Sequence, residues 1–364
     1  MCVLLVIIQW IIAELSAHWT KIMTILGIET SCDETSAAVL IDGIVRSNVI
    51  ASQLFHEKYG GVVPELASRA HMKLIVPIVS EAMEKAGVKK DDLDAIAATY
   101  GPGLIGSLLV GLNFAKANAC GLGIPFIGVN HMEAHLLSNF LSNSKAAPEY
   151  PFVCLTVSGG HTQLVHVRNP FDYEMLGQTR DDAAGEAFDK VAKMLGLGFP
   201  GGPIIDRLAK AGDAKFVKFP RPYLREGSFD FSFSGLKTSV LYWLKERGLY
   251  GNGLASPKDD KLLSDICASF QVAVVDVLVE KTIRAAEKFS VKDVCVAGGV
   301  SANSELRRRM TDEAERHGLR VHFPKMEFCT DNGAMIAYVG WLKLRSGLIS
   351  SIDDVTAVAN LQLT

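Results

Sequence analysis

Two stretches of the chain share a pattern in which an apolar run meets a short polar turn and a second apolar run follows. The first is Thr24–Asp42, with its turn at Thr30–Thr35, and the second is Val153–Val167, with its turn at Ser158–Thr162. Apolar runs on either side of a turn of small and polar residues are typical of β-hairpins. The pattern therefore predicts one hairpin near the start of each half of the chain.

A third stretch, Asp293–Arg309, varies this pattern, because its apolar strand meets Gly298-Gly299 and then enters a helix. The adjacent glycines Gly159 and Gly160 allow a tight turn with unusual dihedrals, and consecutive N–H groups in such a turn can bind an anion. Two hairpin turns and one glycine-rich strand–helix turn fit a duplicated α/β nucleotide-binding fold, with the ligand expected between the halves where strand ends converge. For the second stretch alone, a hairpin without a ligand remains the alternative.

The rest of the pattern predicts helices and further strands. Strands are expected over 45–53, 94–100 and 126–130, and helices over 65–85, 107–120 and 262–289. Another helix is expected to begin within 181–190, with Asp181 and Asp182 in its first turn, where acidic groups are favourable. Asp189, two turns further on, is not explained by capping. His71 is expected on the exposed surface of its helix.

The composition is that of an ordinary globular protein. The chain has 364 residues, 49% of them hydrophobic and 21% charged, and its net charge is −3. This length predicts two domains or one large duplicated domain. The surface is not uniformly basic, so a nucleic-acid partner needs a local patch or a helper protein. Seven scattered cysteines without a CxxC pair favour reduced thiols in a cytosolic protein.

Residues 1–22 stand apart from the rest. Val3–Ile12 is apolar, but no basic residue precedes it, no cleavage site is clear, and it is too short to span a bilayer. Met23 directly precedes the first predicted strand. We therefore expect residues 1–22 to be an extension from an upstream start, with a weak signal core as the alternative.

Residues 206–237 form the best local candidate for a nucleic-acid surface. The segment interleaves phenylalanines and a tyrosine with basic residues, which are Arg207, Lys210, Lys215, Lys218, Arg221, Arg225 and Lys237. Basic side chains neutralise phosphates, and aromatic rings can stack on bases. The alternative is a solvated insertion with a small core of its own.

His131-Met-Glu-Ala-His135 carries two histidines four residues apart. On a helix, residues at this spacing share a face, so both imidazoles can reach one metal ion, although such pairs also arise by coincidence. Asp331, in the polar turn before the last helix, is the natural candidate for a third ligand, or else a helix cap. A zincin protease needs the general base directly after the first histidine. Glu133 instead stands about 200° around the helix from His131, which argues against that chemistry.

Over residues 24 to about 345 the chain resembles one family, the bacterial TsaD type of tRNA N6-adenosine threonylcarbamoyltransferase, formerly described as O-sialoglycoprotein endopeptidase. Nine ordered motifs carry the resemblance. They are Gly27-Ile-Glu-Thr-Ser-Cys-Asp-Glu-Thr35, Gly61-Val-Val-Pro-Glu-Leu-Ala-Ser68, Asn130-His-Met-Glu-Ala-His135, Val157-Ser-Gly-Gly-His-Thr162, Asp181–Lys190, Pro200-Gly-Gly-Pro203, Phe231-Ser-Phe-Ser-Gly-Leu-Lys237, Gly298-Gly-Val-Ser-Ala-Asn303 and Thr330-Asp-Asn-Gly333. Residues 1–22 depart from the family pattern.

The resemblance implies the duplicated actin-like ATPase fold of the sugar kinase/Hsp70 superfamily, which is ribonuclease H-like, with the active site in a cleft between two lobes. We accordingly expect an N-terminal lobe over 23–150, a C-terminal lobe over 151–345 with an insertion at about 206–237, and a tail over 346–364. It also implies transfer of the threonylcarbamoyl group from threonylcarbamoyl-AMP to N6 of the adenosine 3′ of the anticodon, in tRNAs reading ANN codons, with release of AMP.

The resemblance further implies which residues bind. One divalent metal per subunit, iron(II) or otherwise zinc, is expected on His131, His135 and Asp331. The adenylate or nucleotide is expected on Thr156, Val157, Ser158, Gly159, Gly160, Asp189, Gly202, Asp206 and Asn303. The implied partners are tRNA and accessory subunits of the TsaB and TsaE type, in the cytoplasm and without a membrane.

The acyl donor is already activated, so the reaction requires no protein nucleophile. It requires an amine held against a carbonyl and stabilisation of the developing charge. Asp33 or Glu34, in the first loop, could orient water or the attacking amine. Two other functions remain as alternatives: a non-catalytic actin-like nucleotide-binding scaffold, and a metalloprotease.

Overall fold

The computed structural model describes residues 22–141, 147–222, 227–250 and 260–363. Residues 1–21 of the expected extension, together with Tyr223 and Arg225, lie outside the described residues. The chain forms two compact units. The first runs to Ala51 and includes Ser68–His131 and Asn332–Asn360, and the second comprises Ser52–Ala67, Met132–Asp331 and the chain from Leu361.

The first unit is built on a five-stranded mixed sheet with the order β3-β2-β1-β4-β5. Its elements are β1 (Thr24–Glu29), β2 (Glu34–Ile41), β3 (Ile44–Ser52), β4 (Ala95–Gly101), β5 (Phe126–Asn130), α2 (Pro64–Ala86), α3 (Ile105–Leu122) and α10 (Gly333–Arg345). Strands β1 and β2 form the predicted antiparallel hairpin, whereas β4 is parallel to β1 and β5 is parallel to β4.

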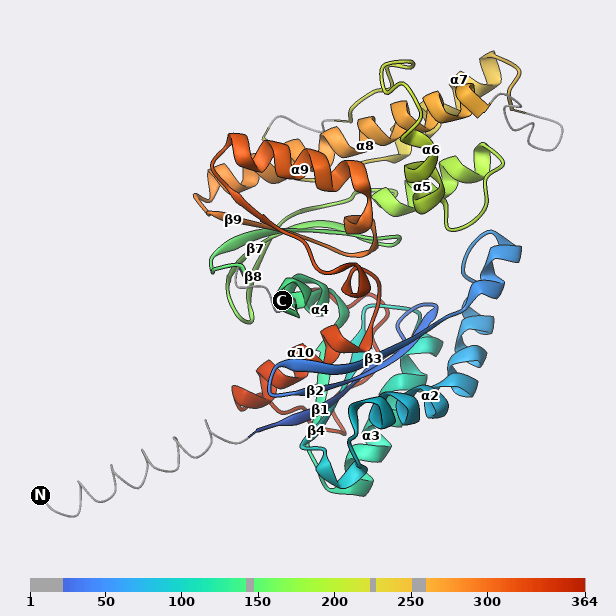
Figure 1. Ribbon diagram of the computed structural model, residues 1–364. Coiled ribbons are helices and arrows are strands. Elements are labelled where there is room, and N and C mark those ends of the chain that lie inside the picture. The colour runs from blue at the N-terminus through green and yellow to red at the C-terminus, as the bar shows by residue number, and fades with distance from the viewer. Residues whose placement is uncertain (1–21, 142–146, 223–226, 251–259, 364) are drawn as a thin grey trace, which may run out of the picture. The chain divides into compact units, whose positions relative to one another are not determined.

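Alternation along the strands sends side chains to two faces of this sheet. Leu26 and Ile28 on β1 pack with Ile96 on β4 against α2 and α3. On the other face α10 lies directly on the strands (Figure 1). A Cβ atom on Gly27 would lie 2.4 Å from the backbone nitrogen of Ala337, so glycine is needed for this close approach.

The second unit repeats the topology, with the sheet order β10-β9-β6-β7-β8. Its strands are β6 (Phe152–Val157), β7 (Thr162–Asn169), β8 (Asp172–Gln178), β9 (Asp293–Ala297) and β10 (Arg320–His322). Its helices are α4 (His131–Leu137, whose first residue belongs to the first unit), α5 (Ala184–Met194), α6 (Gly201–Ala209), α7 (Ser234–Glu246), α8 (Asp260–Lys288) and α9 (Ser304–Arg316). Strands β6 and β7 form the second predicted hairpin, and β9 is parallel to β6.

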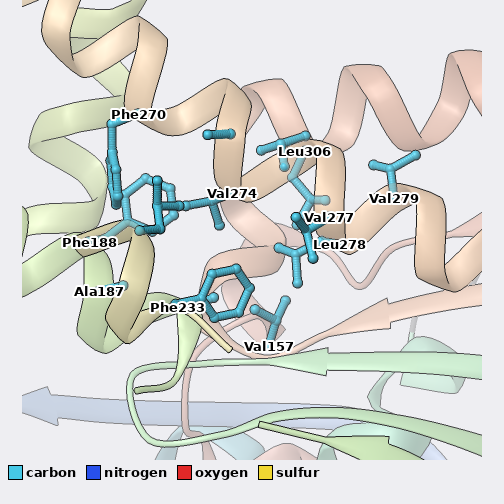
Figure 2. Close-up of a cluster of buried hydrophobic side chains, with 14 of the residues drawn as sticks. Val157, Ala187, Phe188, Phe233, Phe270, Val274, Val277, Leu278, Val279 and Leu306 are labelled. Carbon is cyan, nitrogen blue, oxygen red and sulfur yellow. The ribbon is translucent and has the colours of Figure 1, made fainter. Parts of the chain in front are cut away.

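The larger hydrophobic core of the second unit lies between its sheet and the helices α5 to α9. Figure 2 shows Val157, at the end of β6, beneath Phe233, with Phe188 of α5 beside Phe270 of α8. The opposite face of the sheet is covered by a smaller cluster in which Leu136 of α4 packs with Phe152 and neighbouring strand residues.

Because both sheets have the same order and the same pattern of parallel and antiparallel pairs, the predicted duplicated actin-like α/β fold is confirmed. The grouping of residues differs from the expected lobes in several places. Helix α10 and the chain on to Asn360 belong to the first unit, and α10 packs on β1, β2 and β4. Ser52–Ala67 and the segment that begins at Met132 belong to the second unit. The helix expected over 181–190 begins at Ala184, so Asp181 and Asp182 precede it.

Within the described part of the chain, α3 and α8 are long and apolar enough to cross a membrane by length and composition. The apolar window of α8 is 83% buried inside the protein. Its hydrophobicity is thus accounted for by the core of the second unit.

Candidate functional site

The three residues expected to bind a metal lie together. The donor atoms of His131, His135 and Asp331 all lie within 4.8 Å of one another. Both histidines are buried on α4, and the Asp331 side chain, just before α10, is 20% exposed. The Nε2 atom of His135 lies 3.0 Å from Oδ1 of Asp331.

The donor set fits a divalent transition metal. Two imidazoles and one carboxylate form the ligand pattern of many iron(II) and zinc sites, and it leaves coordination positions open for a substrate. The geometry therefore supports the predicted metal site without distinguishing between the two ions.

A second carboxylate, which the sequence did not reveal as functional, reaches the same cluster. Glu29 ends β1 with no exposed surface, and its Oε2 accepts hydrogen bonds from Nδ1 of His131 at 3.0 Å and from Oγ1 of Thr99 at 2.6 Å. The backbone N–H of Ser31 donates to the other oxygen, Oε1. The Oγ atom of Ser31 lies 3.2 Å from the same His131 nitrogen.

Glu133, between the two histidines in sequence, serves a different purpose. Its Oε1 accepts a hydrogen bond from the Tyr173 hydroxyl at 3.1 Å, and Tyr173 lies on β8. The carboxylate is 5% exposed. This hydrogen bond ties α4 to the sheet of the second unit.

The first hairpin loop, which holds Asp33 and Glu34, is fastened to α2 by a histidine that the sequence analysis placed wrongly. His71 is fully buried rather than exposed. Its Nε2 donates to the Cys32 carbonyl at 2.9 Å, and its Nδ1 lies 2.8 Å from the Thr35 hydroxyl. Asp33 and Glu34 are half-buried and lie between Cys32 and Thr35, the two residues that His71 contacts.

The Ser158–Gly160 turn lies between β6 and β7, as expected. It is closed by hydrogen bonds in both directions between Ser158 and His161. Neither Gly159 nor Gly160 has a positive φ, so the unusual dihedrals expected for them are not found. A Cβ atom on either glycine would meet nothing within 4 Å, which leaves their outer side open to a ligand.

Two other backbone segments approach this turn closely. The N–H of Gly185, at the start of α5, donates to the Ser158 carbonyl at 3.1 Å. A Cβ atom on Gly185 would lie 2.8 Å from the Gly159 nitrogen, and one on Gly298 would lie 2.5 Å from the Val157 carbonyl. The turn after β6, the first turn of α5 and the turn after β9 are thus held together by glycines.

The polar residues expected to bind nucleotide connect neighbouring helices of the second unit. Asp189 accepts a hydrogen bond from the N–H of Gly201 at 2.7 Å, and Asp206 accepts one from the Ser304 hydroxyl at 2.8 Å. Asn303 caps α9 and donates to Gln271 of α8 at 2.8 Å. These contacts bring the first turns of α6 and α9 into one network, while Gly202 has open space around its missing Cβ.

Segment 206–237 exposes fewer aromatic and unpaired basic side chains than its sequence indicated for an RNA-binding surface. Its aromatic residues Phe219, Phe229, Phe231 and Phe233 are buried in the core of the second unit. Arg221 pairs with Asp276, and Lys237 pairs with Asp182. Lys215, Phe216 and Lys218 remain exposed, and Phe216 packs edge-on against Trp243, whose ring also lies 4.1 Å from the Arg247 guanidinium.

Comparison with known proteins identifies the family. A model of the TsaD family, described as tRNA N6-adenosine threonylcarbamoyltransferase, matches residues 44–338. The chain belongs to the TsaD family. A protein of that name from Porphyromonas gingivalis is 52% identical over 340 residues, covering 92% of this chain and 97% of its own. The Salinibacter ruber protein of the same name is 56% identical over 326 residues, covering 89% and 96%.

Solved structures agree on the fold. Full-length HypF in its phosphate- and nucleotide-bound form aligns with a TM-score of 0.59 at 14% identity, over 90% of this chain and 47% of that one. T. kodakarensis HypF gives a TM-score of 0.59 at 16% identity, over 89% and 48%. At these identities the likeness extends to the fold alone.

Proposed function

We propose that this chain transfers the threonylcarbamoyl group of threonylcarbamoyl-AMP to N6 of the adenosine 3′ of the anticodon in tRNAs that read ANN codons. The exocyclic amine adds to the carbamoyl carbon, the bond from that carbon to the phosphate oxygen breaks, and AMP leaves while the amine loses a proton. Membership of the TsaD family, together with the His131–His135–Asp331 cluster, is the observation that supports this reaction.

His131, His135 and Asp331 would hold one divalent metal ion, iron(II) in our proposal and zinc as the other possibility. A bound ion would supply Lewis-acid stabilisation of negative charge on the donor. The protein keeps its two imidazoles buried and fixes them one helical turn apart on α4, so that their positions are set before the donor binds.

The adenylate part of the donor is proposed to bind at the glycine-lined end of the second unit. The Ser158–Gly160 turn follows Thr156 and Val157 at the end of the buried strand and is open on the outer side of Gly159 and Gly160, whose amides would contact the phosphate. The first turn of α5 contacts this turn through Gly185, and the first turns of α6 and α9 lie in the adjoining network of Asp189, Asp206 and Asn303. Helix N-termini favour phosphate groups. Gly202 leaves room for the nucleotide there.

Because the donor is a mixed anhydride, the chain needs no nucleophile of its own, and its task is to orient the amine. Asp33 or Glu34 is proposed for this task, since the His71 contacts hold their loop in one conformation. Lys215, Phe216 and Lys218 are proposed to contact tRNA, with accessory subunits of the TsaB and TsaE type supplying further RNA-binding surface. We propose a cytoplasmic location for the reaction.

Mass spectrometry of nucleosides tests the proposal. Unmodified tRNA is incubated with the chain, the accessory subunits and enzymatically generated threonylcarbamoyl-AMP, then digested and analysed. We expect N6-threonylcarbamoyladenosine at the position 3′ of the anticodon and one AMP per modified base. Binding of adenine nucleotide without modification of tRNA would instead support the non-catalytic scaffold. Peptide cleavage that depends on the histidine pair would support a protease.

A further inference from the structure

We propose that Glu29 is a positioning residue that fixes His131 as a metal ligand. This inference rests on the proposed metal site, because it concerns how one ligand of that site is oriented. Glu29 lies 102 residues before His131 in the sequence, yet its fully buried carboxylate lies 3.0 Å from Nδ1 of that ring.

The hydrogen bonds around Glu29 determine which ring nitrogen carries the proton. The Thr99 hydroxyl donates to Oε2, and the Ser31 backbone N–H donates to Oε1. With a donor already on each oxygen, the carboxylate acts as an acceptor, so the third contact is an Nδ1–H of His131 donating to Oε2. The proton on Nδ1 leaves Nε2 with the lone pair that binds a metal.

The carboxylate itself is rigidly placed. It ends β1, which pairs with both β2 and β4, and Thr99 comes from β4, the strand beside it. A buried carboxylate is costly unless charged or polar partners surround it, and here the imidazole of His131 is such a partner. Electron donation through this hydrogen bond also makes Nε2 more basic, which strengthens its bond to a metal ion.

Glu133 provides the contrast that isolates this role. It is also a buried carboxylate, and it lies between the two histidines on α4, but its Oε1 binds the Tyr173 hydroxyl. Glu29→Gln and Glu133→Gln therefore each remove one buried negative charge without changing side-chain size. Only Glu29→Gln should change the hydrogen bonding of a metal-binding imidazole, that of His131.

The test is the zinc affinity of the full chain, measured by competition with a chromophoric chelator for the wild type and for both variants. We expect Glu29→Gln to bind zinc about 10–100-fold more weakly, the usual effect of losing such a hydrogen-bonding partner, and Glu133→Gln to match the wild type. The absorption spectrum of the cobalt(II) form should change in Glu29→Gln alone. Circular dichroism confirms that each variant is folded.

Glu29→Asp is the second variant, because it keeps the charge but withdraws it from His131 by one methylene. It should also bind zinc more weakly, and it is decisive if Glu29→Gln does not fold. Wild-type affinity in the folded Glu29 variants would overturn the positioning role. A wild-type chain that takes up no metal would instead overturn the metal site itself, so the two failures are distinguishable. Equal weakening by Glu133→Gln would also overturn the inference.

Discussion

The Glu133 carboxylate accepts a hydrogen bond from the Tyr173 hydroxyl at 3.1 Å, although its neighbours in sequence are the two metal-ligand candidates on α4. Burial, followed by the nearby Glu133 charge, raises the pKa of Tyr173 above its ordinary value, so the hydroxyl keeps its proton and remains a donor. The pair therefore holds the helix that carries the histidines, and we expect Glu133 to take no part in proton transfer.

Replacing Glu133 with Gln should cost about 1–2 kcal/mol in the free energy of unfolding, the typical effect of weakening a buried hydrogen bond. Transfer to tRNA should continue. Denaturant unfolding and nucleoside analysis measure the two effects, and Tyr173→Phe should give a similar, non-additive loss of stability. If Glu133→Gln were stable but inactive, a catalytic role for this carboxylate would have to be reconsidered.

Gly159→Val should abolish binding of adenine nucleotides while leaving the fold intact. The space beyond the missing Cβ contains no protein atom within 4 Å, so valine fits the protein but blocks the approach of a phosphate. Isothermal titration calorimetry with AMP measures the loss. Gly121→Val, at a helical glycine that is equally open, is the control and should bind normally. Normal nucleotide affinity in Gly159→Val would place the phosphate elsewhere.

Replacing Lys215 and Lys218 with Ala should weaken tRNA binding most strongly at low salt. Each lost phosphate contact lowers the magnitude of the slope of log affinity against log salt concentration by roughly 0.7–0.9. The slope of the double variant should therefore be smaller in magnitude by about 1.4–1.8. Fluorescence anisotropy over a series of salt concentrations gives the slope. Arg308→Ala is the control, because that guanidinium already pairs with Glu305 and Asp312. An unchanged slope in the double variant would show that these lysines do not contact tRNA and that the partner subunits supply the RNA-binding surface.

Asp293 should make folding sensitive to acid. Burial alone would raise its pKa, but hydrogen bonds from Arg320 and His322 outweigh burial and hold the pKa below the ordinary value of 3.8. The ionised carboxylate therefore stabilises the fold above pH 4, and this stabilisation is lost as the pH falls through the lowered pKa.

Asp293→Asn should lower the urea midpoint at pH 7, and the difference from wild type should shrink below pH 4. Asp172→Asn serves as the control, since Asp172 pairs with Arg168 on an exposed surface, where ion pairs contribute little. A difference that stayed constant from pH 7 to pH 3 would show that the Asp293 charge is not responsible.

Local sequence patterns predicted the strands and turns because these depend on residues close together in the chain. The apolar runs on either side of a polar turn in Thr24–Asp42 and Val153–Val167 were enough to predict both hairpins, and the spacing of His131 and His135 was enough to place them on one helical face. Helix α10 belongs to the first unit because it packs against strands that are distant in the sequence, so no local sequence pattern could predict this grouping.

Contacts between distant segments account for what was missed. Glu29 and His71 act through partners that only the folded chain brings near. Both belong to stretches of small and polar residues, and that feature was the one local signal of a functional role. Asp181 was expected in the first turn of a helix, but it instead accepts hydrogen bonds from Phe233 and Ser234 at the start of α7. Four of the five phenylalanines that alternate with basic residues in segment 206–237 fill a core, and Phe216 alone of them is exposed.

The most direct test of the account compares wild type, His131→Ala and His135→Ala in the reconstituted reaction, using isotope-labelled threonine to form the donor. Label incorporated into N6-threonylcarbamoyladenosine is counted by mass spectrometry, and bound metal is measured on the same samples. We predict that the wild type modifies tRNA, and that each variant stays folded but loses both metal and label incorporation. Full incorporation by a folded variant without metal would contradict the account.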